Sequence, residues 1–271
     1  MRVTVLAEDT AGCDGVTAEH GLSLLVTASG KTVLCDAGRS DATWHNAAVL
    51  DAPLDDVCAA VLSHGHYDHS GGFSAFLTAH PAVPLYMRRG ADGDFFHGER
   101  YIGIDKALAT LPQTKQIDDA GVTRVDDVLS LFGGFGMTFP RPAGNAELTV
   151  RDTAGERADT FFHEQAAVIT EGERRVLISG CAHSGILNIL ERFSALYGGM
   201  PDAVFSGFHT AQSTPYTADE AAAVRALGRA LAATGVTFYT GHCTGDEAFA
   251  LLKEEMGERL CSLTCGKTIC I

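Results

Sequence analysis

One ten-residue stretch, Ser63 to Gly72, constrains the fold of this chain more than any other feature. It carries three imidazoles and one carboxylate within six residues: His64, His66, Asp68 and His69. An apolar run at residues 57–62 precedes it and predicts a buried strand, and the pair Gly71-Gly72 predicts the start of a helix. In open α/β sheets, ligands bind at the carboxyl ends of strands. The stretch therefore predicts an α/β fold with a polar site at one sheet edge.

The spacing within this stretch predicts a metal site. In an extended segment, residues two apart point the same way, so His64, His66 and Asp68 can converge, while His69 points elsewhere and can serve a second ion. Gly65 lets the loop bend without steric cost. Imidazole and carboxylate suit the same divalent ions. A surface loop with chance histidines would not concentrate four potential ligands directly after a buried strand.

The motif His-x-His-x-Asp-His, followed by a glycine-rich turn, resembles the signature of the metallo-β-lactamase superfamily. The resemblance implies a four-layer αββα sandwich with one or two metal ions at the edge between its two sheets. The hairpin that precedes the motif ends in Asp36-Ala37-Gly38 and resembles the superfamily's opening hairpin, in which the aspartate supports the metal loop. From the residues alone, Asp36 is equally well a strand-end cap.

A second polar cluster, Gly180-Cys181-Ala182-His183, again lies between a predicted strand and a predicted helix. In the superfamily this strand end usually supplies an aspartate that bridges two metals, and in some β-lactamases a thiolate binds the second one, so Cys181 is a candidate ligand. The superfamily's upstream Gly-His is absent, and its nearest substitute is His163-Glu164. We favour His183 over His163 as third ligand, because a strand end fixes a ligand better.

Two further histidines follow predicted strands. His242 stands where the superfamily places its last metal-binding histidine. His209 can contact the substrate or donate a proton, and it can equally be a supporting or merely exposed imidazole. With these residues, the expected ligands of a first ion are His64, His66 and His183. Those of a second ion are Asp68, His69 and His242, with Cys181 as an additional ligand.

The expected cofactor is one or two divalent ions, with zinc favoured over manganese and iron. Two ions about 3.5–4 Å apart can bind a hydroxide between them and polarise the scissile group. A metal lowers the pKa of its water to about 7, so no serine or cysteine nucleophile is needed. Asp68 could orient the hydroxide and receive its proton.

Composition limits the partners. A net charge of −14 argues against a nucleic-acid binder, and no apolar run approaches membrane-spanning length. The chain enters a strand pattern at its first residues, and its eight cysteines contain no Cys-x-x-Cys pair, so we expect reduced thiols and a cytoplasmic location. The substrate should be a small molecule, and nothing indicates the oligomeric state.

We expect one domain, residues 1–271, because no linker divides the chain. Residues 88–124 are less periodic and predict either a lid over the site or an irregular surface excursion. Residues 125–135 and 146–150 predict strands of the second sheet. Two capping boxes, Thr217 to Glu220 and Thr244 to Glu247, predict helix starts.

Three functions fit these features. The first is a metal-dependent hydrolase that uses a metal-bound hydroxide on a small phosphorylated or ester-type substrate. The second follows from the Gly-Cys-Ala-His pattern, which is similar to a subgroup of cytoplasmic metal-dependent hydrolases; some of its members are named dihydropterin–ribofuranosylaminobenzene-phosphate synthases. This implies a pterin-related synthase acting on a ribosyl phosphate. The third is a metal-containing binding or sensing protein with little turnover.

Overall fold

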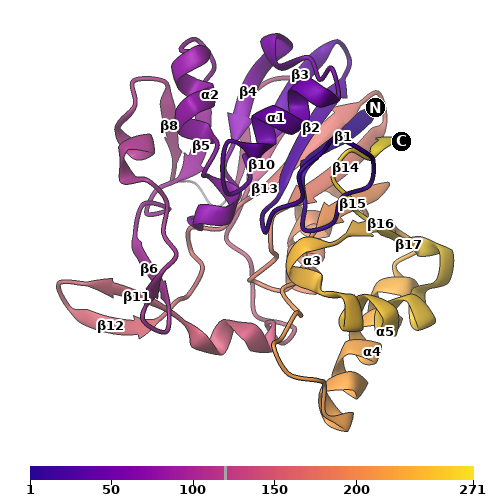
Figure 1. The fold of residues 1–271 in the computed structure, drawn as a ribbon. Coiled ribbons are helices and arrows are strands. Elements are labelled where there is room, and N and C mark those ends of the chain that lie inside the picture. The colour runs from indigo at the N-terminus through magenta and orange to yellow at the C-terminus, as the bar shows by residue number, and fades with distance from the viewer. Residues whose placement is uncertain (119–120) are drawn as a thin grey trace.

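The computed structural model describes residues 1–118 and 121–271. Two seven-stranded sheets lie face to face, with helices on their outer sides (Figure 1). In its spatial order, the first sheet consists of β18 (Thr268–Cys270), β1 (Arg2–Ala7), β2 (Ser23–Ala28), β3 (Lys31–Cys35), β4 (Val57–Val61), β5 (Leu85–Arg88) and β8 (Thr114–Ile117). The strands from β3 to β8 are parallel, whereas β18, β1, β2 and β3 pair antiparallel.

The second sheet has the same plan. In order it consists of β17 (Leu260–Ser262), β16 (Thr237–Thr240), β15 (Ala203–Ser206), β14 (Arg174–Ser179), β13 (Ala166–Glu171), β10 (Leu129–Phe132) and β9 (Val122–Arg124). The strands from β14 to β17 are parallel, and the other pairs are antiparallel. Because parallel strands end at a common edge, the loops after β14, β15 and β16 lie together.

Five α-helices complete the layers: α1 (Ala42–Val49), α2 (Phe73–Ala79), α3 (Ile186–Tyr197), α4 (Ala218–Ala233) and α5 (Asp246–Met256). Helices α1 and α2 pack on the first sheet, and the other three pack on the second. This confirms the expected αββα sandwich. The first capping box is confirmed, since Thr217 and Glu220 cap α4 reciprocally. The helix predicted after the second box does form, as α5, but the box itself is wrong: the N-cap residue is Gly245, and no side chain caps the helix.

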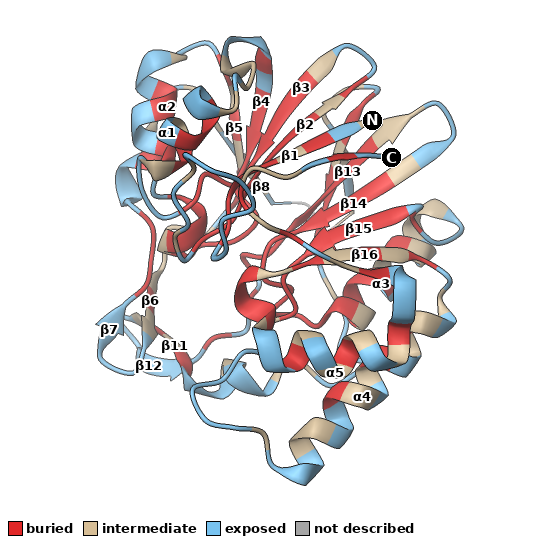
Figure 2. Ribbon diagram, turned by 45° about the vertical axis from the view of Figure 1, so that its right-hand side comes forward, coloured by how far each residue is buried: buried red, intermediate tan, exposed pale blue. Residues whose placement is uncertain are grey.

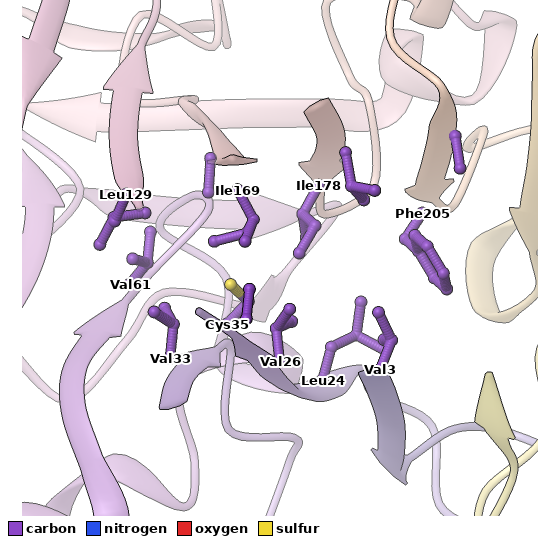
Figure 3. Packing of buried hydrophobic residues seen from close by; sticks show 14 of the residues in the cluster. Val3, Leu24, Val26, Val33, Cys35, Val61, Leu129, Ile169, Ile178 and Phe205 are labelled. Atoms are coloured by element: carbon purple, nitrogen blue, oxygen red, sulfur yellow. The ribbon is translucent and has the colours of Figure 1, made fainter. Parts of the chain in front are cut away.

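The core between the sheets follows from the alternation of side chains along each strand. In β2, Leu24 and Val26 face the other sheet, whereas Leu25 faces the outer helices. Figure 3 shows these side chains opposed to Leu129, Ile169, Ile178 and Phe205 of the second sheet. Because helices cover the outer faces of the sheets, the central strands carry apolar side chains on both faces. Figure 2 shows these strands as almost wholly buried.

A third, four-stranded sheet stands apart from the sandwich (Figure 1). Its order is β12 (Gly155–Ala158), β11 (Leu148–Asp152), β6 (Asp94–His97) and β7 (Arg100–Tyr101). The predicted strand at 146–150 is therefore real but was assigned to the wrong sheet, because β11 pairs with β6. Of the expected lid at 88–124, β6 and β7 lie here and β8 lies in the first sheet. Residues 119–120 lie outside the described part, and a lid function stays a prediction.

Candidate metal centre

The loop after β4 carries the first cluster, and Asp36 at the end of β3 holds it in place. The Asp36 carboxylate accepts hydrogen bonds from the backbone nitrogen and the hydroxyl of Ser63, each at 2.7 Å, and from Nδ1 of His69 at 2.7 Å. Asp36 has a positive φ of 59°, which turns the chain at this strand end. The structure thus favours a role in supporting the loop over a simple strand cap.

Gly65 has a steric role that differs from the expected one. A Cβ atom at this position would lie 2.2 Å from the carbonyl oxygen of Ala91, so the close approach of the loop to the segment after β5 requires glycine. Gly65 is not among the residues with positive φ in the described part of the chain. Close packing, rather than a tight bend, therefore explains the residue.

The structure brings His64, His66 and His183 together: one ligand atom of each lies within 4.8 Å of the others. The hydroxyl of Ser63, which donates to Asp36, lies 2.8 Å from Nδ1 of His64, and the amide oxygen of Asn145 lies 2.9 Å from Nδ1 of His183. Both neighbours can therefore accept a hydrogen bond from a protonated Nδ1, which leaves Nε2 with a free lone pair. The Nε2 atoms of all three histidines are buried, and among the described residues none has a hydrogen-bond partner.

Burial, followed by the neighbouring imidazoles, lowers the pKa of His64 and of His183 well below the usual value. Burial is likewise the main cause that lowers the pKa of His66 to about 3. These three rings are therefore neutral at neutral pH, which is the form that binds metal.

His163, the alternative third ligand, does not join this group. Its Nδ1 accepts a hydrogen bond from the backbone nitrogen of Gly65 at 3.0 Å, and its Nε2 lies 3.0 Å from Asp159. Both ring nitrogens are therefore occupied. Its neighbour Glu164 accepts hydrogen bonds from the backbone nitrogens of His183 and Ser184, at 2.7 and 2.8 Å. Residues 161–165 thus support both loops that carry candidate ligands, the one after β4 and the one after β14.

Asp68, His69 and His242 also come together. Oδ2 of Asp68 lies 3.2 Å from Nε2 of His242 and 3.9 Å from Nε2 of His69. Burial by itself would raise the pKa of Asp68, but His69 and His242 outweigh it and lower that pKa far below the usual value. Burial would lower the pKa of His69 and of His242, yet Asp36 and Asp68 raise the first, and Asp68 and Asp9 raise the second. Protons therefore compete with a bound cation for these two imidazoles.

Cys181 lies between the two groups. Its Sγ is 3.1 Å from Nε2 of His69, and it clusters separately with His64 and His69 and with His183 and His209. The ring of His209 lies 4.2 Å from that of His183, and Nδ1 of His209 is buried with no hydrogen-bond partner among the described residues. His209 therefore adjoins the site rather than lying exposed.

Three contributors were missed in the sequence. Asp9 lies 2.7 Å from Nδ1 of His242 and 2.8 Å from Nδ1 of His20, and Nε2 of His20 lies 3.4 Å from Asp68. Asn145 holds His183, as described above. The sequence position of Asp9 does indicate a site residue, because Asp9 follows a buried strand that runs in the same direction as β3. No sequence pattern points to His20, which lies on a loop, or to Asn145, which lies in the 3-10 helix Ala143–Glu147.

The donor set fits divalent metal ions. Three buried Nε2 atoms, those of His64, His66 and His183, have no hydrogen-bond partner in the described chain, and Nε2 of His242 lies 3.2 Å from the carboxylate of Asp68. Each converges with other nitrogen, oxygen or sulfur donors. Buried polar atoms are rarely left unpaired without a ligand to satisfy them. The arrangement can hold one ion on three imidazoles and a second on the group around His242.

Comparison with known proteins gives a consistent picture. A family model described as "Metallo-beta-lactamase superfamily" matches residues 16–242. A Methanocaldococcus jannaschii protein named 7,8-dihydropterin-6-methyl-4-(beta-D-ribofuranosyl)-aminobenzene-5'-phosphate synthase is 26% identical over 99% of this chain and 96% of its own.

Two solved structures show the same fold. One is described as a metal-dependent hydrolase of the beta-lactamase superfamily; it has a TM-score of 0.85 and 30% identity, over 100% of this chain and 99% of its own. The other is Zn(2+)-bound PqqB from Methylobacterium extorquens, with a TM-score of 0.59 and 14% identity over the whole of both chains. This second likeness concerns the fold alone.

Proposed function

The chain belongs to the metallo-β-lactamase superfamily, and from this premise we propose that it is a metal-dependent hydrolase of a small phosphorylated or ester-type substrate. The superfamily fold is that of metal-dependent hydrolases. We further propose one or two divalent ions as cofactor, with zinc favoured over manganese and iron. One observation carries the proposal: the buried Nε2 atoms of His64, His66 and His183 have no hydrogen-bond partners in the described chain, and ligand atoms of these three residues converge. Ser63 and Asn145 hold the Nδ1 atoms of His64 and His183.

The residues have separate roles in this proposal. His64, His66 and His183 would hold the first ion, and the group around Asp68, His69 and His242 the second. Bound divalent ions supply Lewis-acid chemistry, which activates water and polarises the scissile bond. The lowered pKa of Asp68 keeps its carboxylate ionised, so Asp68 can accept a hydrogen bond from the attacking water and orient it. His209 adjoins the first group and can donate a proton to the leaving group.

A phosphorylated substrate is supported by the surroundings of the metal loop. The guanidinium carbons of Arg39 and Arg100 lie 5.6 and 5.8 Å from the ring centre of Tyr67, which stands between two loop ligands. Both arginines are exposed residues. In a chain of net charge −14, two such guanidinium groups beside the site favour an anionic group on the substrate.

A second candidate is the pterin-related synthase. It is favoured by the extent of the likeness to the M. jannaschii protein, which covers 99% of this chain. Binding of a reduced pterin phosphate by the metal-loaded protein would favour this function over general ester hydrolysis. A cytoplasmic location and a small-molecule substrate stay proposals, as does the absence of nucleic-acid partners. No helix in the described residues is long and apolar enough to span a membrane.

The test combines metal content with turnover. Protein expressed with added zinc, manganese or iron should contain one to two ions per chain by elemental analysis, and it should hydrolyse at least one member of a panel of phosphomonoesters, phosphodiesters, lactones and thioesters. Chelation should abolish that activity, and adding metal back should restore it. Metal without turnover on any substrate would favour a binding or sensing protein. A content below about a tenth of an ion per chain would contradict the proposal.

A further inference from the structure

Cys243 is a buried thiol beside the metal centre with no role so far. It follows His242 in a short 3-10 helix, His242–Thr244, and its side chain is 6% exposed. The backbone N–H of His209 donates a hydrogen bond to its sulfur at 3.3 Å. A Cβ atom on Gly207 would lie 2.4 Å from the same sulfur. These contacts enclose the sulfur atom and restrict its position.

In this position the sulfur lies beside candidate ligands of the second ion. The sulfur atoms of Cys243 and Cys181 and a ring nitrogen of His242 lie within 4.8 Å of one another, and all three residues are buried. Nδ1 of His242 is hydrogen-bonded to Asp9, so the nitrogen that remains for a ligand is Nε2, which lies 3.2 Å from the carboxylate of Asp68. Two sulfurs and one imidazole nitrogen thus surround one point.

We propose that Cys243, Cys181 and His242 bind the same divalent ion, so that the second metal position of this chain is rich in sulfur. The inference rests on the proposed function, because it requires a metalloprotein. Two thiolates with imidazole nitrogen form a donor set that selects zinc, cobalt or iron and discriminates against magnesium and manganese. Binding of the ion releases the protons of the two thiols.

This donor set also changes the role of Asp68. The expected ligands of the second ion were Asp68, His69 and His242, which would make Asp68 both a ligand and a proton acceptor. With two sulfur donors, and with Nε2 of His69 at 3.1 Å from Cys181, the second ion can be complete without the carboxylate. Asp68, whose carboxylate lies 3.2 Å from Nε2 of His242, then remains free to bind and orient the attacking water.

Cobalt spectroscopy tests the proposal directly. Bonds between Co(II) and thiolates give strong charge-transfer absorption in the near ultraviolet, whereas imidazole and carboxylate ligands do not. The cobalt-loaded protein should show this absorption, and Cys243→Ser and Cys181→Ser should each lose about half of it. The double variant should lose it all. Cys58→Ser is the matched control, because Cys58 is an exposed thiol on β4, and it should absorb like the unaltered protein.

The outcomes separate this inference from the proposed function. Cobalt binding with full charge-transfer absorption in Cys243→Ser would overturn the inference and leave the hydrolase proposal intact. Failure of the unaltered protein to bind cobalt or zinc would overturn the hydrolase proposal itself. Cys243→Ala gives a second variant if the serine protein does not fold. The cadmium-113 resonance of the unaltered protein needs no variant, and a shift typical of nitrogen and oxygen ligands alone would also overturn the inference.

A competition experiment measures the consequence for metal choice. In mixtures of zinc and manganese, Cys243→Ser should lose at least about 10-fold of its preference for zinc at the second position, a loss on the scale seen when support of a metal ligand is removed. An unchanged preference would contradict the proposed sulfur ligand.

Discussion

Asp9 accepts a hydrogen bond from Nδ1 of His242 at 2.7 Å, although 233 positions separate the two residues in the chain. Asp9 follows the first strand of the first sheet, and His242 follows β16 of the second. The contact therefore connects the two sheets at the metal centre. It also fixes which nitrogen of His242 faces the site, because the N–H directed at Asp9 leaves Nε2 as the free donor atom.

We predict that Asp9→Ala weakens metal binding at the second position by about 10- to 100-fold, the usual cost of removing a partner that orients a ligand histidine. Binding at the first position should change little. Competition with a chromophoric chelator measures both affinities. Asp14→Ala is the matched control, because Asp14 is an exposed carboxylate of the same loop. Equal losses in both variants would show that the effect is one of general charge.

His183→Ala and His163→Ala should separate metal binding from stability. Removing His183 opens the first position, so we expect the loss of about one ion per chain by elemental analysis. Removing His163 leaves Asp159 buried without its partner, which should lower the free energy of unfolding by about 1–3 kcal/mol. The metal content of His163→Ala should stay near that of the unaltered protein. Metal loss only in His163→Ala would mean that His163 is the ligand.

Asp68→Asn should retain the fold and lose most of the turnover. Asparagine preserves the shape of the side chain but removes its charge and its ability to accept a proton. The measurement is kcat on whichever substrate the panel identifies, with circular dichroism as the check on folding. Asp55→Asn, at an exposed carboxylate before β4, is the control. An unchanged kcat in Asp68→Asn would show that this carboxylate takes no part in the reaction.

Metal binding should depend on pH differently at the two positions. The imidazoles of the first position have lowered pKa values, with His66 at about 3, so protons do not compete for them near neutral pH. His69 and His242 have raised pKa values, so an ion must displace their protons, and its affinity rises with pH. We expect one ion per chain near about pH 6 and two near about pH 8. Equilibrium dialysis with elemental analysis checks this, and a parallel loss of both ions on acidification would contradict it.

The sequence was informative where one short segment carries the whole signal. The loop at 63–72 predicted a strand, a ligand cluster and a helix, and the structure has β4, the cluster and α2 there. The capping box at Thr217 and Glu220 involves atoms only three residues apart, and it forms as predicted. In such cases local geometry determines the outcome.

Predictions are wrong where a residue or strand pairs with a segment that is distant in the sequence. Thr244 does not cap α5, because its hydroxyl accepts a hydrogen bond from the backbone of Phe208 and lies 2.6 Å from the hydroxyl of Thr240. Residues 148–152 form a strand as expected, but their partner is β6 rather than the second sheet. The sequence pattern of a strand predicts that the strand forms, but it does not predict which strand it pairs with.

The same limit explains the missed site residues. Asn145, His20 and Cys243 become informative only when the fold brings them beside His183, Asp68 and Cys181. None of them stands in a motif with its partner. By contrast, the preference for His183 over His163 rests on the rigidity of a strand end. In the structure both ring nitrogens of His163 have hydrogen-bond partners, whereas Nε2 of His183 has none in the described chain.

The candidate ligands come from loops of both sheets, and this has a consequence for unfolding. An ion held by His64 and His66 on one side and His183 on the other joins segments that are far apart in the chain, much as a covalent crosslink would. Its release must precede separation of the sheets, so bound metal should slow unfolding as well as raise the melting temperature. The centre that performs chemistry would then also set the lifetime of the folded protein.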